Sequence, residues 1–270
     1  MNFSVLMSIY YKENPAYFHR AMESIYNEQS VKPNEIVLVE DGRLTEELYA
    51  SINFWKNILN DTLKIVTLKE NVGLGKALNI GLSECTHNLV ARMDTDDISL
   101  PHRFERQLHV FSEKDIDICG TWISEFDSKE QEIIAYRKVP QMHDTIVTYS
   151  KKRNPLNHPS VMYKKSRIEQ SGNYQVMQGF EDYYLWTRAI QTGLVLYNIQ
   201  EALVHMRAGY GQLERRGGVG YAYNEILFQH RLYTTGYIHL FEYIRNITLR
   251  TTIRLFPKYF LKRIYKSLRD

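Results

Sequence analysis

Apolar residues in the first hundred positions follow two alternating patterns. Short continuous runs rich in β-branched residues predict buried strands, and stretches in which apolar residues recur every three or four positions predict amphipathic helices. One helix is expected to begin at Pro15, with Asn14 as its N-cap, and a second is expected over residues 46–58. The predicted strands are "FSVLMSI", "NEIVLVEDG", "LKIVTL" and "HNLVARMD", and the turn "NVGLGKALNIGLSEC" opens a further helix before the last of them.

Four strands that alternate with helices predict an α/β fold with a mostly parallel sheet and helices on both faces. After Pro101 the pattern changes, and a helix to about residue 112 is followed by paired strands, a short strand, a helix closed by Gly193 and a last strand. We expect one domain over residues 1–218 and a helical extension over residues 219–270. The later segments are "DIDICGTWISEF", "EIIAYRKV", "NHPSVMYKKS", "GFEDYYLWTRAIQTG", "LVLYNIQEALVHMRA" and the glycine-rich loop "GYGQLERRGGVG".

The composition is that of a globular protein, because 44% of the 270 residues are apolar. Two cysteines, Cys85 and Cys119, exclude a disulfide framework and fit a reducing compartment. The N-terminus has the pattern of a first strand, so no signal peptide is expected. No apolar run approaches the ~18 residues that span a bilayer, so no transmembrane segment is expected either.

The net charge of +3 conceals a basic C-terminal segment. Residues 242–270 contain eight lysines and arginines against two acids, a charge of +6, which leaves −3 for the first 241 residues. Apolar and aromatic residues are interleaved with these cations, and Pro257 is expected to divide the segment into two helices. Such helices can lie in a membrane interface, pack on the domain or form a dimer. Nucleic acid binding is disfavoured, because the rest of the chain is net negative and gathers aspartates. The sequence carries no signal for an oligomeric state.

Three aspartates follow the fourth predicted strand, in "VARMDTDDISLP". On an extended segment, residues two apart face the same way, so Asp94 and Asp96 are expected to converge, while Asp97 points elsewhere or begins a turn. Two convergent carboxylates are costly unless a cation neutralises them. Mg²⁺ and Mn²⁺ prefer oxygen ligands and leave positions for phosphate oxygens, which favours a metal–diphosphate site. The alternative is a polar turn that caps the helix after Pro101.

Polar residues also follow other predicted strands. Glu40 and Asp41 end the second strand, where a carboxylate can accept from a ribose or a nucleobase. In "NVGLGKALN", Gly73 and Gly75 allow a ligand to approach the backbone, and Lys76 and Asn79 can donate hydrogen bonds. This segment lacks both the P-loop and the dinucleotide fingerprint. The carboxyl ends of parallel strands share one edge, where ligands of such sheets bind.

A set of these segments, in order over residues 3–215, resembles the family 2 glycosyltransferases, closest to the AmsE-like bacterial branch that builds exopolysaccharide and O-antigen units. The resemblance implies the GT-A fold, a Rossmann-like, nucleotide-binding mixed sheet flanked by helices. The resemblance implies an inverting, metal-dependent transfer of a hexose or N-acetylhexosamine from a UDP-sugar to a polyprenyl-diphosphate-linked saccharide. A β-linkage, of which β-1,3 is a common type in this branch, would form at the cytoplasmic face of the bacterial inner membrane. The segments are "VLMSIYYKENPAYFHRAMESIYNEQ", "EIVLVEDG", "ENVGLGKALNIGL", "ARMDTDDISLPHRFERQ", "NHPSVMYKKS" and "FEDYYLW".

The resemblance also implies roles for individual residues. Asp94 and Asp96 would hold Mn²⁺ or Mg²⁺ on the donor diphosphate, with Asp97 as a helper. Asp182 would be the general base, and Glu181 would orient the acceptor. The implied nucleotide- and diphosphate-binding residues are Glu40, Asp41 (the favoured nucleobase contact), Asn71, Gly73, Lys76, Arg92, Asp94 and His158. Arg215 and Arg216 are an arginine pair flanked by glycines, which can close over a diphosphate with forked hydrogen bonds or can belong to a solvated loop.

Each of these roles has a plainer alternative. Arg92 can form a salt bridge within the site, and His158 can be structural. Glu181 and Asp182 can be an acidic first turn stabilised by the helix dipole. Trp186 suits core packing better than a platform for a sugar ring. For the chain as a whole, the alternatives are a sugar-1-phosphate nucleotidyltransferase, which would want a basic phosphate loop after the first strand, and a non-catalytic carbohydrate-binding scaffold, which predicts decayed carboxylates.

Overall fold

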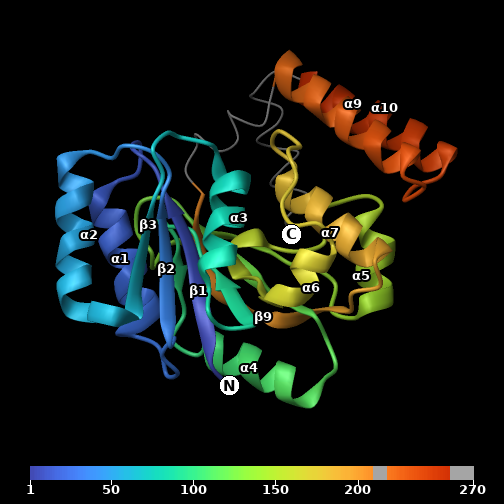
Figure 1. Ribbon diagram of the computed structural model, residues 1–270. Helices are drawn as coiled ribbons and strands as arrows, with labels where there is room; N and C mark the ends of the chain where they lie inside the picture. The colour runs from blue at the N-terminus through green and yellow to red at the C-terminus, as the bar shows by residue number, and fades with distance from the viewer. Residues whose placement is uncertain (209–217, 256–270) are drawn as a thin grey trace.

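The computed structural model describes residues 1–208 and 218–255, and within these residues nine strands form a single mixed sheet. The strand order is β3-β2-β1-β4-β8-β6-β9-β5, with β7 paired to β6 (Figure 1). The strands are β1 (Phe3–Ile9), β2 (Glu35–Glu40), β3 (Leu63–Thr67), β4 (Leu89–Arg92), β5 (Ile98–Ser99), β6 (Ile118–Phe126), β7 (Ile133–Arg137), β8 (Met162–Lys164) and β9 (Leu196–Arg207).

The first four strands are parallel, as predicted. Ile9 of β1 lies opposite Glu40 of β2, and Leu6 lies opposite Arg92 of β4, so the carboxyl ends of these strands meet at one edge. The other half makes the sheet mixed, as expected of the GT-A fold, because β8 runs antiparallel to both β4 and β6. The chain enters β8 at the edge where the carboxyl ends of the parallel strands meet, through the 3₁₀ turn His158–Ser160. Strand β8 must therefore run in the opposite direction.

Helices cover both faces of the sheet. Alternate residues of β1 explain the layers: Val5 and Met7 pack with α1, α2 and α4, whereas Leu6 packs with the helices of the other face. The sequence analysis did not predict the short helices α5 (His143–Ser150) and α6 (Lys165–Gln170). The helices of the first face are α1 (Pro15–Tyr26), α2 (Glu46–Leu59, followed by the 3₁₀ turn Asn60–Thr62) and α4 (Arg103–Glu113); those of the second are α3 (Leu74–Glu84), α5 (His143–Ser150), α6 (Lys165–Gln170) and α7 (Glu181–Gln191).

Local signals account for several element boundaries. Asn14 caps α1 by accepting a hydrogen bond from the Ala16 N–H at 2.8 Å, as predicted. Gly193 follows α7 with φ +80°, a left-handed conformation that glycine adopts at little cost. Gly81 in α3 has a different role, because a Cβ there would lie 2.5 Å from the side chains of Leu6 and Val39. Helix α3 therefore packs on β1 and β2 at a distance that a larger residue would prevent.

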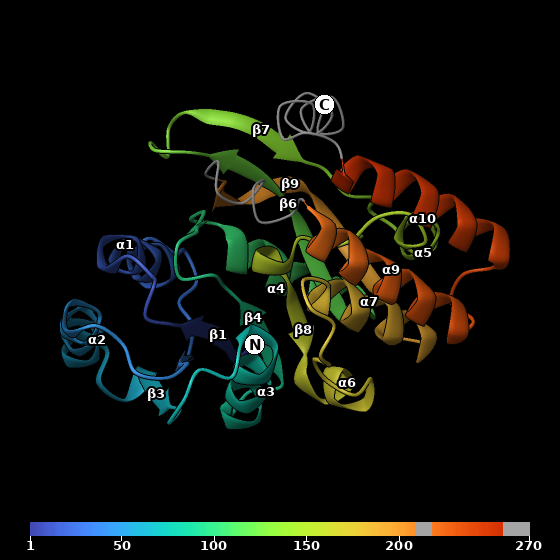
Figure 2. The ribbon, with the colours of Figure 1, turned by 90° about the horizontal axis from the view of Figure 1, so that it is seen from above.

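The C-terminal helices α9 (Val219–Thr234) and α10 (Leu240–Leu255) form a hairpin that packs on α7 (Figure 2). The Phe228 ring of α9 stacks on Phe180 at 4.8 Å and contacts Tyr183 of α7 at the same centroid distance. A boundary at residue 218 stays a prediction, and Pro257 with the segment after it lies outside the described residues. No helix in the described ranges combines the length and the hydropathy that crossing a bilayer requires.

A buried ion cluster joins the two helices of the hairpin. Glu225 of α9 is fully buried, and its carboxylate lies 2.7 Å from Arg250 and 3.4 Å from Arg254 of α10. Beside them, Asn246 of α10 donates hydrogen bonds to Gln229 and to the Lys151 carbonyl after α5. A buried charge is tolerated only when it is paired, so this cluster fixes the register of α10 against α9.

We predict that Glu225→Gln lowers the free energy of unfolding by about 3 kcal/mol, because it leaves two arginines buried without their counter-ion. Urea denaturation followed by circular dichroism measures the change. The control is Glu84→Gln, which removes an exposed pair with Lys64 at 2.7 Å and should cost less than about 1 kcal/mol. Similar small losses for both variants would show that the buried cluster does not stabilise the hairpin.

Candidate active site

Residues 94–97 form a turn between β4 and β5, not the extended segment that the sequence analysis assumed. Asp94, Asp96 and Asp97 each contribute a carboxylate oxygen, and these three atoms lie within 4.8 Å of one another. The expected convergence of Asp94 and Asp96 is confirmed. Of the two alternatives for Asp97, the turn is the one that the structure shows, and this turn brings the Asp97 carboxylate back to the other two. The helix-capping alternative is wrong, since α4 has no side-chain cap.

The acidic turn concentrates negative charge in a partly buried place. Burial and the neighbouring Asp94 carboxylate raise the pKa of Asp96 to about 6, and burial with both neighbours raises the pKa of Asp97 well above its usual value. The Oδ2 atom of Asp97 is buried and accepts no hydrogen bond from any described residue. Carboxylate oxygens are the ligands that Mg²⁺ and Mn²⁺ prefer, so this donor set fits a divalent cation.

Arg92 is the nearest cation to the turn. It is 2% exposed, and its Nη2 donates a hydrogen bond to Asp94 Oδ1, which confirms the salt bridge that the sequence left as an alternative. Its Nε and Nη1 atoms are buried and have no partner among the described residues. Two donors of a buried guanidinium are thus available beside the acidic turn.

Arg207, at the end of β9, holds the turn from the other side. Its backbone N–H donates to Asp97 Oδ1 at 2.8 Å, and its Nε donates to the Asp96 carbonyl at 3.2 Å. The guanidinium lies over the Tyr17 ring at 3.7 Å and over the Phe126 ring at 4.5 Å. Stacking on two rings restricts the arginine, so the backbone of the turn has a fixed support.

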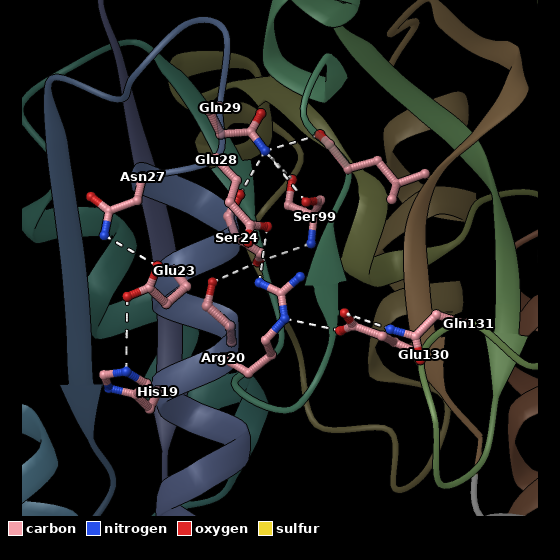
Figure 3. A network of polar contacts seen from close by, with 12 residues as sticks. His19, Arg20, Glu23, Ser24, Asn27, Glu28, Gln29, Ser99, Glu130 and Gln131 are labelled. Carbon is pink, nitrogen blue, oxygen red and sulfur yellow. Dashed lines mark hydrogen bonds and ion pairs between the residues drawn. The ribbon is translucent and has the colours of Figure 1, made fainter.

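The strand that leaves the turn, β5, is tied to the end of α1 by the network in Figure 3. The Ser99 N–H donates to Ser24 Oγ at 3.0 Å, and Gln29 Nε2 donates to the carbonyls of Ser24 at 2.6 Å and Leu100 at 2.9 Å. Nearby, Arg20 lies 2.9 Å from the carboxylates of both Glu28 and Glu130. The acidic turn is therefore anchored at both of its ends.

The two carboxylates that end β2 organise the loop before α3. Asp41 accepts hydrogen bonds from the Val72 N–H at 2.7 Å and the Gly73 N–H at 3.1 Å, and its carbonyl accepts from Asn71 Nδ2. Glu40 accepts from the Thr67 hydroxyl at 2.7 Å. Next to them, Gly42 has φ +84°, and a Cβ there would lie 2.7 Å from the Asn71 nitrogen. The nucleobase role of Asp41 stays a prediction, as do the roles of Glu40, Asn71, Gly73 and the exposed Lys76.

Glu181 and Asp182 are the first two residues of α7, and both are half-buried. Asn154 Nδ2 donates to Asp182 Oδ2 at 2.6 Å, and burial raises the pKa of Glu181. A Cβ at Gly75, near the start of α3, would lie 3.5 Å from Glu181 Cγ, so the N-termini of α3 and α7 face each other. Sequence reasoning missed Asn154, which carries no motif and lies 28 residues before its partner.

Tyr174 connects these parts and was also missed. Its hydroxyl is 2.7 Å from His158 Nε2, while both amide atoms of Asn79 bond its backbone, at 2.7 and 2.9 Å. Asn79 is therefore occupied by structure and is not a free donor for a nucleotide. Burial and the charge of Arg92 lower the pKa of His158 well below its usual value, so the ring is neutral. Trp186 is fully buried, which confirms core packing over the sugar platform.

Comparisons with known proteins agree with this arrangement. The model of the family described as glycosyl transferase family 2 matches residues 4–172. The chain belongs to glycosyl transferase family 2. The nucleotidyltransferase alternative is therefore wrong. Arg215 and Arg216, the glycine-flanked pair expected to bind a diphosphate, lie outside the described residues, and their role stays a prediction.

Two bacterial members of the family are similar over almost their whole length. The chain is 41% identical to the UDP-Gal:alpha-D-GlcNAc-diphosphoundecaprenol beta-1,3-galactosyltransferase of Escherichia coli, covering 98% of this chain and 96% of that protein. It is 38% identical to the amylovoran biosynthesis glycosyltransferase AmsE of Erwinia amylovora, covering 98% of each. The resemblance to the AmsE-like branch is thus confirmed.

A solved glycosyltransferase structure shares the fold. The crystal structure of S. aureus TarS 1–349 in complex with UDP-GlcNAc superposes with a TM-score of 0.64 at 19% identity, and the match covers 86% of this chain and 66% of that chain. The α/β architecture is therefore the GT-A type that the sequence predicted.

We predict that Asn154→Ala lowers the rate of glycosyl transfer by one to two orders of magnitude, roughly the cost of misplacing a reacting group by an ångström. Binding of the sugar nucleotide should stay within about twofold, because Asn154 touches the α7 carboxylate and not the acidic turn. The control is Asn27→Ala, which removes an exposed amide contact with Glu23 on α1. Steady-state kinetics and calorimetry separate the two effects, and weaker nucleotide binding with an unchanged rate would contradict the assignment.

Proposed function

We propose that this glycosyltransferase is an inverting, metal-dependent enzyme that moves a hexose or N-acetylhexosamine from a UDP-sugar to a polyprenyl-diphosphate-linked saccharide. The observation that carries the proposal is the convergence of three carboxylates, one with a buried oxygen that lacks a partner among the described residues, at the carboxyl edge of a parallel sheet. The printed names of the relatives support the substrates: UDP-Gal and diphosphoundecaprenol-linked GlcNAc for the E. coli protein, and UDP-GlcNAc in the TarS complex. A β-1,3 linkage, as in the first name, would assemble O-antigen or exopolysaccharide units.

On the donor side, Asp94 and Asp96 would hold Mn²⁺ or Mg²⁺, and Asp97, whose carboxylate lies beside theirs, would help as a third oxygen donor. A bound cation would neutralise the negative charge that develops on the leaving nucleoside diphosphate. Arg92 has two donors without a partner among the described residues, and a phosphate oxygen would suit them. His158 is neutral and hydrogen-bonded to the Tyr174 hydroxyl. It would therefore hold this part of the site in shape without adding a charge.

The remaining contacts to the donor follow from the loops at the edge of the sheet. Asp41 fixes the backbone of Val72 and Gly73, which places the start of α3 against the nucleotide. The same side of the nucleotide would also be lined by Glu40, Asn71 and Lys76. Asp41 would contact the nucleobase. Arg215 and Arg216 would grip a diphosphate by charge-assisted hydrogen bonds.

On the acceptor side, Asp182 would act as the general base. An acceptor hydroxyl has a pKa far above 7, so its proton must be removed as it attacks the anomeric carbon. Asn154 occupies Oδ2 of Asp182, and this leaves Oδ1 to take the proton. The new C–O bond forms on the face opposite the breaking bond to the diphosphate, and one displacement inverts the anomeric centre. Glu181 stands next to the base and would orient the acceptor.

The proposed acceptor carries a lipid, and this places the enzyme at the cytoplasmic face of the bacterial inner membrane. Arg250 and Arg254 pair with Glu225, but the other six cations of the basic segment over residues 242–270 support association with an anionic leaflet, since each cation near such a surface contributes about 1 kcal/mol. A non-catalytic scaffold is disfavoured, because it has no need to keep three carboxylates together against their mutual repulsion.

Asp182→Asn is expected to reduce turnover by about three orders of magnitude, within the range attributed to general base catalysis. Donor binding should be unchanged, because the amide keeps the shape of the carboxylate. The matched control is Asp144→Asn, which changes an exposed acid in the first turn of α5. Transfer from UDP-sugars onto a synthetic GlcNAc-diphosphate-lipid, measured beside UDP-sugar binding, tests the assignment; near-normal turnover by the Asp182→Asn variant would remove Asp182 as the base.

Asp96→Asn is expected to weaken Mn²⁺-dependent binding of UDP by at least about tenfold, because it replaces a charged ligand by a neutral one. Calorimetric titration of UDP, with and without Mn²⁺ and after chelation, measures the effect without any turnover. Asp115→Asn, at an exposed acid after α4, serves as the control. Equal affinity with and without Mn²⁺ in the wild-type protein would show that the acidic turn holds no metal.

A further inference from the structure

The outer side of the C-terminal hairpin exposes large apolar residues. Phe241 of α10 is 77% exposed, and three further large apolar residues of this helix are more than half exposed. Helix α9 adds three more at four-residue intervals, which places them on one side of the helix. Single exposed apolar residues are normal, but a group on two adjacent helices marks an interaction surface. We call six of these residues the apolar face: Val219, Tyr223, Leu227, Leu240, Phe241 and Ile244. Leu249 lies half a turn around α10 from Leu240 and does not belong to it.

The opposite side of the hairpin is already occupied. Helix α9 packs on α7 through Phe228 and Leu232, and α10 donates from Asn246 and Arg250 to the carbonyls that follow α5. The buried Glu225 cluster joins the two helices. The hairpin is therefore fixed on the domain by one side, and nothing in the described parts of the chain covers the apolar face.

The apolar face lies at the same end of the molecule as the candidate site. In Figure 1 the N-terminus, where β1 begins, is at the bottom, so the carboxyl ends of the parallel strands are at the top, and α9 and α10 lie at the upper right. Figure 2, which looks down on this end, shows both helices of the hairpin toward the viewer. The hairpin and the edge of the sheet that carries the acidic turn thus lie at one end of the molecule.

Charge indicates what kind of surface this is. The chain that continues from α10, residues 256–270, contains five lysines and arginines against one aspartate. In a dimer, two such basic segments would repel each other if they came close, whereas an anionic lipid surface would attract them. Apolar residues on one side of a helix with cations next to them are typical of helices that lie in a membrane interface.

We propose that the apolar face of the α9–α10 hairpin docks on the headgroup region of an anionic bilayer, with the acidic turn toward the lipid surface. This rests on the proposed function, because a lipid-linked acceptor is presented at such a surface. It assigns the contact to folded helices with defined residues, in addition to the basic segment. The hairpin inserts its apolar side chains between the headgroups and the acyl chains.

The test compares two matched double variants of the full chain. Phe241→Glu with Ile244→Glu places two charges on the apolar face, and Phe54→Glu with Ile58→Glu makes the same changes at exposed positions of α2. Sedimentation with vesicles of phosphatidylglycerol and phosphatidylethanolamine should show wild-type binding for the α2 variant. The hairpin variant should bind about tenfold more weakly or worse, because two buried apolar side chains are lost from the interface.

Two further measurements make each outcome decisive. All three proteins should transfer sugar at the same rate to a water-soluble, short-chain acceptor diphosphate, which shows that the hairpin variant is folded. If no protein transfers sugar, the proposed function fails, and vesicle binding still tests the docking. Unchanged vesicle binding by the hairpin variant overturns the proposal. So does light scattering that shows a lipid-free wild-type dimer converted to a monomer by Phe241→Glu with Ile244→Glu, because the face is then a contact between two copies.

Discussion

Mutual repulsion among the carboxylates of Asp94, Asp96 and Asp97 is the constraint around which the rest of this structure is arranged. Three acids in a partly buried turn do not stay together unless their surroundings hold them. Arg92 supplies a counter-charge from β4, and the backbone of Arg207 binds the turn from β9. The hydrogen bonds at the end of α1 hold β5, the strand that follows the acidic turn. The protein thus maintains an unfavourable arrangement of charge that a bound cation would relieve.

The topology of the sheet explains why the partners of the turn come from such distant parts of the chain. Parallel pairing brings the ends of β1, β2 and β4 to one edge, and the antiparallel β8 returns from that edge. The 3₁₀ turn before β8 and the segment at Tyr174 then fill the space between the acidic turn and α7. The proposed catalytic and nucleotide-binding groups therefore share one wall, in which Tyr174 and His158 contact each other.

The sequence predicts the elements of this fold better than the contacts of its site. Strands such as β1 are continuous apolar runs, and Asn14 with Pro15 marks a helix start, so local chemistry is sufficient. Helices α5 and α6, with eight and six residues, are too short for a clear periodicity. The position of Asp97 depends on a turn that the strand rule does not describe. Asn154 and Tyr174 act through partners 28 and 16 residues away, and no local pattern records such pairs.

The stack of Phe180 on Phe228 has a consequence for how far the enzyme can reach. Phe180 directly precedes the two acids that begin α7, and its ring is fixed against α9. The stack therefore joins the hairpin directly to the start of α7, where the proposed base lies. A hairpin resting on a lipid surface would hold Asp182 at a set height above it. Such a fixed height would select acceptors by length, because only a saccharide of matching length would present its terminal hydroxyl at the level of Asp182.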